Sequence, residues 1–153
     1  MKFLMPIDLM TATADPASGA AGDLYYNTTD QCIRVHNGTA WEYADQFVLP
    51  YTFQGTLAVT TGVLRLYNNS GSQWTIFRSD VYVATAPTGA AATFLVKKNG
   101  TTAQTLTVAT GTNAANSTTK VTVANGDYLT VDISTVGSTV AGANAQLVLN
   151  VAG

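Results

Sequence analysis

The sequence contains little charge and almost no cysteine. Only 10% of its 153 residues are Asp, Glu, Lys or Arg, and the formal net charge is -2. Seven cations are too few to build the basic stripe that follows a phosphate backbone, so nucleic acid is not an expected partner. The single cysteine cannot form an intramolecular disulfide, so packing or association with other subunits must supply the stability.

Long apolar runs are also missing. The opening MKFLMPIDLM is interrupted by Pro6 and Asp8, and no stretch of about 18 apolar residues follows it. We therefore expect neither a cleaved export signal nor a membrane-inserted segment. Apolar residues nevertheless make up 46% of the chain, which is enough to bury the core of one ordinary domain.

Side-chain polarity alternates with a period of two along most of the chain, and helical spacing is never sustained over about ten residues. This pattern predicts an all-β protein. Its first part is expected to be a three-stranded meander with strands at 24–27, 32–36 and 39–43. The turns are expected at 28–31 and at Asn37-Gly38, since Asn and Gly accept the positive φ angles of tight turns.

The chain changes character near residue 46, where strict alternation is lost before Pro50. We therefore expect two parts, residues 1–46 and residues 47–153. About eight alternating segments make up the second part, as in a jelly-roll-like β-sandwich whose two sheets bury alternate faces. These segments lie at 44–55, 56–60, 62–68, 74–86, 92–100, 104–110, 120–135 and 145–151.

Three details of the second part are specific enough to check. In segment 104–110, Leu106 and Val108 should point inward and the threonines outward. The polar stretch 111–119 is expected to be a loop. Segment 120–135 is expected to form a hairpin across Asn125-Gly126, with these apolar residues facing one another: Val121 and Val123 against Leu129, Val131 and Ile133.

The only cysteine and the only histidine, Cys32 and His36, lie four residues apart in one predicted strand. Ile33 and Val35 are expected to face the packed side. Cys32, Arg34 and His36 would then point the other way, with about 13 Å between the cysteine and the histidine. A Cys-His nucleophile pair needs a separation of about 3 Å. We therefore expect a surface histidine, a semi-buried cysteine and no thiol catalysis.

No motif for catalysis, metal binding or cofactor binding is evident. One Cys and one His leave a tetrahedral zinc site two ligands short. Asp127 belongs to a predicted turn and Asp132 is expected to face outward among threonines, so both carboxylates should be solvated. Glycosidase pairs, G-x-S-x-G and phosphate-binding glycine loops are absent. We therefore expect a non-catalytic protein without a cofactor or metal.

Four aromatic residues leave a carbohydrate-binding function open. Tyr67, Trp74, Tyr82 and Tyr128 could offer stacking faces for sugars, and the loops are rich in Asn. The structural interpretation is that these residues belong to the core, to strand ends or to subunit contacts. The outward strand positions are mostly uncharged threonines, and such faces either aggregate or are covered. A packed oligomer is therefore expected.

The segment GDLYYNTTDQCIRVHNGTAWEY (22–43) resembles a strand-turn-strand module found near the N-termini of tail-fibre and other appendage proteins of bacteriophages. Residues 74–151, with WTIFRSDVYVATAPTGA, FLVKKNGTT and NGDYLTVDIST, are similar to a β-sandwich of minor tail and head-surface proteins of tailed phages. The resemblance implies a homotrimer on the virion surface, assembled in the host cytoplasm, with the major capsid protein or a tail protein as its partner.

The chain departs from the usual fibre pattern because it has no collagen-like repeat, heptad repeat or internal repeat that could form a shaft. This favours a head decoration protein. A minor tail, fibre or baseplate protein whose sandwich binds host-surface carbohydrate remains the alternative. The apolar residues expected to attach the protein to the particle are Phe3, Leu4, Met5, Ile7 and Leu9.

Overall fold

The structure is a computed structural model that describes residues 8–153. All regular structure in this part of the chain is β, so the described residues hold no helix that could cross a membrane. Of the predicted attachment residues, Phe3, Leu4, Met5 and Ile7 lie outside the described residues. Leu9 is half-buried. The all-β prediction is confirmed.

A small sheet has the strand order β1-β2-β3-β4. Its strands are β1 (Thr11–Ala12), β2 (Leu24–Asn27), β3 (Cys32–His36) and β4 (Trp41–Tyr43). The three predicted strands are present as an antiparallel meander. Sequence analysis missed β1, which pairs with β2 in parallel and is only two residues long. Two residues are too few to show an alternating pattern.

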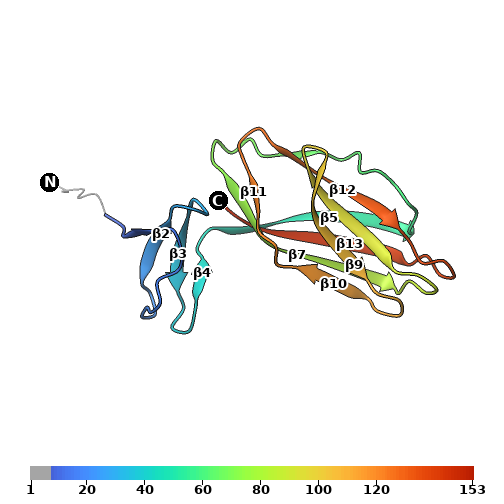
Figure 1. Ribbon diagram of the computed structural model, residues 1–153, viewed down its shortest axis with the longest axis horizontal. Helices are drawn as coiled ribbons and strands as arrows, with labels where there is room; N and C mark the ends of the chain where they lie inside the picture. The colour runs from blue at the N-terminus through green and yellow to red at the C-terminus, as the bar shows by residue number, and fades with distance from the viewer. Residues whose placement is uncertain (1–7) are drawn as a thin grey trace.

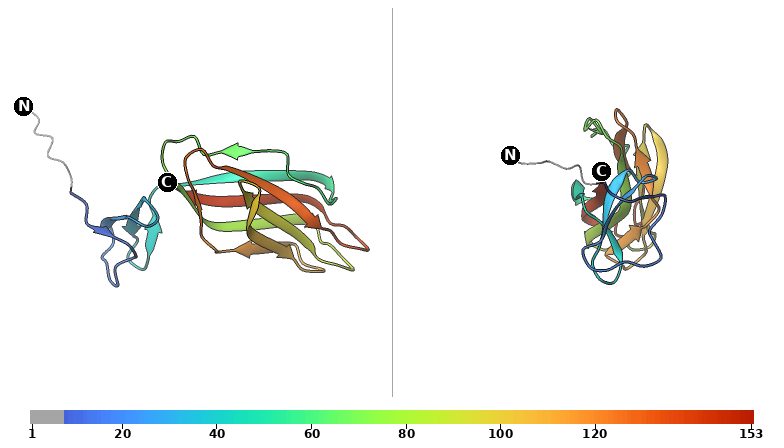
Figure 2. Two further views of the ribbon diagram at one scale, coloured as in Figure 1. Left: turned by 45° about the horizontal axis from the view of Figure 1, so that its top comes forward. Right: turned by 90° about the vertical axis from the view of Figure 1, so that its left-hand side faces the viewer.

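Two larger sheets form the rest of the molecule. One has the order β10-β7-β13-β5, with β11 also paired to β7, and the other has the order β6-β12-β8-β9. The strands are β5 (Gln46–Thr56), β6 (Leu66–Tyr67), β7 (Trp74–Thr85), β8 (Ala92–Lys98), β9 (Thr101–Val108), β10 (Ala114–Ser117), β11 (Val121–Val123), β12 (Tyr128–Thr135) and β13 (Ala143–Ala152). Figure 1 shows these strands side by side along the long axis, with the small sheet at one end. Figure 2 shows the two large sheets as facing layers.

The two large sheets bury a common apolar core between them. It is built from alternate residues of strands in both sheets, including Ile76, Val81, Phe94, Val96, Leu106, Val108, Leu129, Val131, Leu147 and Leu149. Leu106 and Val108 point inward and the neighbouring threonines are exposed, as predicted. The Tyr51 hydroxyl donates a hydrogen bond to the Leu129 carbonyl (2.9 Å), which ties β5 to the opposite sheet.

Asn-Gly pairs lie in connections between strands, and one of these pairs has positive φ angles at both residues. Asn99 and Gly100 both have positive φ angles (51° and 82°) and form the two-residue connection between β8 and β9. At Asn37-Gly38 only the glycine has a positive φ. The Asn37 side chain instead accepts hydrogen bonds from the Thr39 and Ala40 amides, which closes a longer loop.

The predicted hairpin in segment 120–135 is wrong. β11 pairs with β7, whereas β12 pairs with β6 and β8, so the chain crosses from one sheet to the other at Asn125-Gly126. Asn68 holds this corner, because its side chain donates to the Val123 carbonyl (2.9 Å) and its carbonyl accepts from the Gly126 amide. β11 and β12 lie in different sheets, and their apolar residues face one another across the core. The sequence therefore shows the same alternation of apolar and polar residues as a hairpin would.

Two further segments differ from the prediction. Segment 56–60 forms only an isolated bridge at Thr60, and segment 62–68 forms only the short β6. This part of the chain runs along β12, bridged to Ile133 at Thr60 and paired through β6, and it lies so close that a Cβ at Gly62 would be 2.2 Å from the Val131 carbonyl oxygen. The stretch 111–119, predicted as a loop, contains β10, whose small and polar side chains hide its pairing with β7.

Candidate functional site

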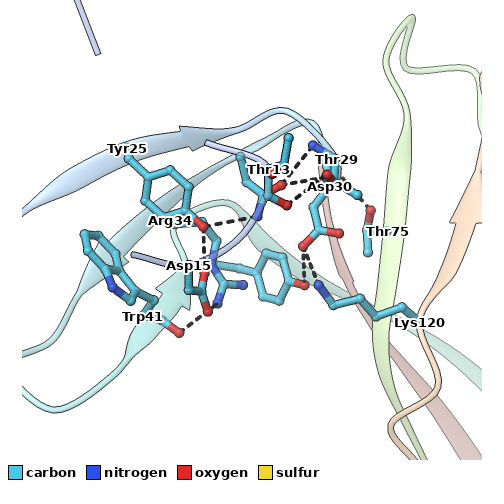
Figure 3. A network of polar contacts seen from close by, with 11 residues as sticks. Thr13, Asp15, Tyr25, Thr29, Asp30, Arg34, Trp41, Thr75 and Lys120 are labelled. Carbon is cyan, nitrogen blue, oxygen red and sulfur yellow. Dashed lines mark hydrogen bonds and ion pairs between the residues drawn. The ribbon is translucent and has the colours of Figure 1, made fainter. Parts of the chain in front are cut away.

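The small sheet joins the larger body through a buried carboxylate, Asp30, in the turn between β2 and β3 (Figure 3). This residue is 5% exposed. Its Oδ2 accepts hydrogen bonds from the Tyr43 hydroxyl (3.0 Å) and from Lys120 Nζ (2.5 Å), and its main-chain carbonyl accepts one from Thr75 Oγ1 (3.2 Å). Lys120 lies directly before β11 and Thr75 lies in β7, so one turn of the small sheet binds two separate segments of the larger body.

Apolar contacts surround this carboxylate. The Tyr43 ring stacks on Phe77, with 4.5 Å between the ring centroids, and Cys32, Tyr43 and Ala152 form a small buried cluster. Phe77 has no partner in the register between β7 and β13, where the pairing shifts at a bulge. The bulge adds an extra residue to β7 where the small sheet contacts it.

Arg34 organises the interior of the small sheet. Its guanidinium lies 3.9 Å from the centroid of the Tyr43 ring, and Nη2 donates to Asp15 Oδ2 (3.0 Å) and to the Trp41 carbonyl (2.9 Å). Asp15 also accepts a hydrogen bond from the Tyr25 hydroxyl (2.6 Å). The side chains of Arg34, Tyr43 and Asp30 thus form a continuous path from β3, a middle strand of the small sheet, to the larger body (Figure 3).

Burial and hydrogen bonds shift pKa values in this region. It raises the pKa of Tyr25 to about 12, with a further contribution from Asp15, and it raises the pKa of Cys32 to about 11. Burial alone would lower the pKa of Lys120, but hydrogen bonds to Asp30 and Tyr43 outweigh it and raise the pKa. The lysine therefore stays charged at neutral pH, and the cysteine and tyrosine stay protonated.

The predicted orientation of β3 is wrong. Cys32, Arg34 and His36 are its buried residues, and Ile33 and Val35 are only half-buried. The aromatic and ionic partners of the buried face come from β4, from residues 15–19 and from the larger body, so polarity alone did not reveal which face is covered. His36 packs edge-on against Trp41 with 5.0 Å between the ring centroids.

The expectation that Cys32 and His36 do not form a catalytic pair stays a prediction. The two residues occupy opposite ends of β3. His36 Nδ1 accepts a hydrogen bond from the Gly38 amide (3.1 Å), and Cys32 belongs to the cluster with Tyr43 and Ala152. Within residues 8–153, no group of three His, Cys, Asp or Glu side chains could hold a metal ion.

The predicted solvation of Asp132 is also wrong. Asp132 is 6% exposed, and the segment beside β12 contacts it through Gly62. Its carboxylate pairs with Lys97 and accepts a hydrogen bond from the Gly62 amide (2.8 Å). Burial alone would raise the pKa of Asp132, but these two partners outweigh it and lower the pKa. Asp127 lies in its predicted turn and is half-buried, accepting hydrogen bonds from Asn99 (2.6 Å) and Ala124 (2.9 Å).

The four predicted aromatic contact residues do not form one surface. Tyr67 and Tyr128 lie opposite each other in the register of β6 and β12, with ring centroids 5.5 Å apart. Trp74 instead packs edge-on against Phe47 beside the core. Tyr82 is 53% exposed on β7, in the other large sheet.

Sequence analysis missed two residues that complete these sites. Lys120 lies 90 residues from Asp30 in the chain, so no local pattern links them. Arg65 lies with its guanidinium carbon 4.6 Å from the centroid of the Tyr128 ring. The sequence R-x-Y over 65–67 places an arginine and a tyrosine on one face of a strand. This pattern is the feature of the sequence that could have identified Arg65.

Comparisons with known proteins identify no family. No family model matches the chain, and no curated protein matches it. Among solved structures, it is similar to a chain from the disulfide-linked pili of Bacillus endospore appendages. The identity is 20% and the TM-score is 0.33, over 70% of this chain and 82% of that chain. A likeness at this level supports no conclusion about function.

Proposed function

We propose that the protein is a non-catalytic structural component of a tailed-phage virion, and specifically a head decoration protein. The motifs in residues 22–43 and 74–151 suggest this class of protein through their resemblance to virion surface proteins. The structural observation that carries the proposal is the division into two unequal parts, with a small sheet docked at one end of an elongated body (Figure 1). Residues 1–46 attach the protein, and residues 47–153 are displayed.

The displayed part is a jelly roll in this proposal. If β10 and β11 are counted as one interrupted strand, the strands pair from the outside inward: β5 with β13, β6 with β12, β7 with β10 and β11, and β8 with β9. Successive pairs alternate between the two large sheets. A long hairpin rolled into two sheets produces this pairing, and jelly rolls are common in viral capsid proteins.

A homotrimer is the proposed assembly state. β5 is an edge strand that pairs only with β13, and beside it Val63 and Leu64 are exposed. Exposed strand edges next to apolar side chains favour association with another subunit. The full-length protein should sediment as a trimer, and its melting temperature should rise with protein concentration. Val63→Asp should weaken the trimer, and a concentration-independent monomer would contradict this assignment.

Particle decoration tests the division of roles. A protein lacking residues 1–45 keeps β5 intact and should give a β-sheet circular dichroism spectrum. It should not add to particles that lack the native protein, whereas the full-length protein should add to them. A full-length variant with Phe3→Ser and Leu4→Ser keeps the small sheet and should also fail to bind. Full occupancy by the truncated protein would mean that the larger body is the anchor.

A minor tail, fibre or baseplate protein that binds host-surface carbohydrate remains the second candidate. The observation that favours it is the adjacent pair of the exposed Tyr67 and the half-buried Tyr128. Immunogold labelling of virions with antibody to this chain separates the candidates, because a decoration protein labels the head and a fibre or baseplate protein labels the tail.

A further inference from the structure

Three side chains form a cluster on the outer face of the β6-β12-β8-β9 sheet. Tyr67 and Tyr128 face each other across β6 and β12, with 50° between the ring planes. The guanidinium of Arg65 lies over the Tyr128 ring. Tyr67 is 47% exposed, so its ring is accessible to a ligand. The small sheet contacts Thr75 and Phe77 of the other large sheet and leaves this cluster free.

Arg65 differs from the other cations of residues 8–153 because no carboxylate lies within 4.0 Å of it. The others each pair with an aspartate; these pairs are Arg34–Asp15, Arg78–Asp80, Lys97–Asp132, Lys98–Asp127 and Lys120–Asp30. A guanidinium carries five donors in a planar fork that suits a carboxylate, and it can stack on an aromatic ring at the same time. Arg65 therefore has the geometry to receive a carboxylate from outside the chain.

A hollow of about 260 Å³ lies beside this arginine. Its lining includes Arg65, Tyr128, Lys97, Asp132, Thr61 and Thr130. The Lys97–Asp132 ion pair is held in place by the Gly62 amide, which donates to Asp132 Oδ1. The hollow therefore presents cationic donors, a carboxylate acceptor, two hydroxyls and an aromatic ring close together. Its volume is below the roughly 300–1,000 Å³ of drug-sized ligand pockets, which suits one sugar ring.

We propose that this hollow binds a sugar unit that carries a carboxylate, such as a hexuronic acid. The sugar carboxylate pairs with Arg65, and the ring contacts Tyr128, which lines the hollow, and extends to Tyr67 beside it. The sugar hydroxyls need both donors and acceptors, and the Lys97–Asp132 pair supplies both, with the threonine hydroxyls adding further partners. An acidic peptide could pair a carboxylate with Arg65. It would leave the Lys97–Asp132 pair and the threonine hydroxyls of the hollow without sugar hydroxyls to bind. The proposal does not depend on virion attachment, because binding is measured on the isolated protein.

Binding of a matched pair of sugars tests the ligand class. Methyl β-glucuronide and methyl β-glucoside differ only at C6, which is a carboxylate in the first and a hydroxymethyl group in the second. Both are titrated into the full-length protein by NMR up to about 20 mM, since a single sugar ring binds weakly. The glucuronide should shift backbone amides of β6 and β12 and bind at least tenfold more tightly than the glucoside. Equal binding of the two sugars, or no binding of either, would overturn the proposal. A hexaglutamate peptide bound as tightly as the glucuronide would also overturn it, in favour of a protein-contact surface.

Substitutions locate the site. Arg65→Gln should remove the preference for the glucuronide, and Arg65→Lys should weaken it, because lysine keeps the charge but loses the planar fork. Tyr67→Ala should weaken binding of both sugars, and the exposure of Tyr67 makes the variant tolerable for folding. Tyr82→Ala is the matched control, since Tyr82 is similarly exposed on the other large sheet and should leave binding unchanged. Unchanged binding in Arg65→Gln and Tyr67→Ala, or an equal loss in Tyr82→Ala, would refute the assignment.

Discussion

Removal of the Asp30 carboxylate should release the small sheet from the larger body. Asp30→Ala leaves the buried Tyr43 hydroxyl without its acceptor and Lys120 without its carboxylate. Loss of a hydrogen bond to a charged group costs about 1.5–3 kcal/mol. The Lys120 side chain is 55% exposed, so solvent screens the ion pair and its contribution is about 0–1 kcal/mol. Tyr43 belongs to the small sheet and Lys120 to the larger body, so the two losses together lower the stability of the folded and docked small sheet by about 1.5–4 kcal/mol, with about 2–3 kcal/mol near the middle of this range.

Amide hydrogen exchange measures this loss of stability in the small sheet itself. A small meander is marginal on its own, so undocking and local unfolding of β2, β3 and β4 should occur together. In Asp30→Ala, their amides should exchange about 30–150-fold faster, which corresponds to the expected free energy. Amides of β8 and β12, on the far sheet, should keep their protection.

A second ion pair of similar exposure supplies the control. The Arg78 side chain is 48% exposed and pairs with Asp80, but both residues lie on β7 within the larger body. Arg78→Ala should leave exchange in the small sheet unchanged. In a double-mutant cycle, Asp30→Ala and Lys120→Ala should show a coupling of about 0.5–1 kcal/mol. Equal exchange of the small-sheet amides in the Asp30 and Arg78 variants would refute docking through this carboxylate.

Three further predictions concern the small sheet. Cys32 of the native protein should react with iodoacetamide at pH 7.5 at least about 100-fold more slowly than Cys32 of the protein unfolded in urea, because its pKa is raised from 9.0 to about 11. Equal rates would contradict its burial. The raised pKa values of Cys32 and Tyr25 mean that the folded state holds these protons more tightly, so this stabilisation is complete below about pH 9 and is lost as pH rises toward 12. The urea midpoint should therefore decrease as the pH is raised from 8 to 10.5. A midpoint that stays constant over this range would contradict the raised pKa values. His36→Ala should cost about 1.5–3 kcal/mol in urea unfolding, since it removes a buried ring packed on Trp41; a cost below about 0.5 kcal/mol, as is usual at exposed sites, would show the ring to be solvated.

The strands of the larger body were predictable where alternation is long and regular. β7, β8 and β13 lie within two residues of their predicted bounds; β9 begins three residues before its predicted start, and its inward residues Leu106 and Val108 are the predicted ones. The turn at Asn99-Gly100 was predictable because both residues must adopt positive φ angles, which few other residue pairs accept. These features depend on local backbone geometry and on neighbours in sequence, and the sequence contains both.

Pairing and burial were not predictable in the same way. A period of two shows that residues share a face, but it does not show which face is covered or which strand lies beside it. The buried face of β3, the crossing between β11 and β12, and the burial of Asp132 all depend on segments that are distant in sequence. Asp30 and Lys120 meet across 90 residues, and only the packing of the two parts creates the contact between them. Local sequence determined the strands of this protein, and tertiary structure decided which of their polar residues are buried, because burial depends on what packs against a face.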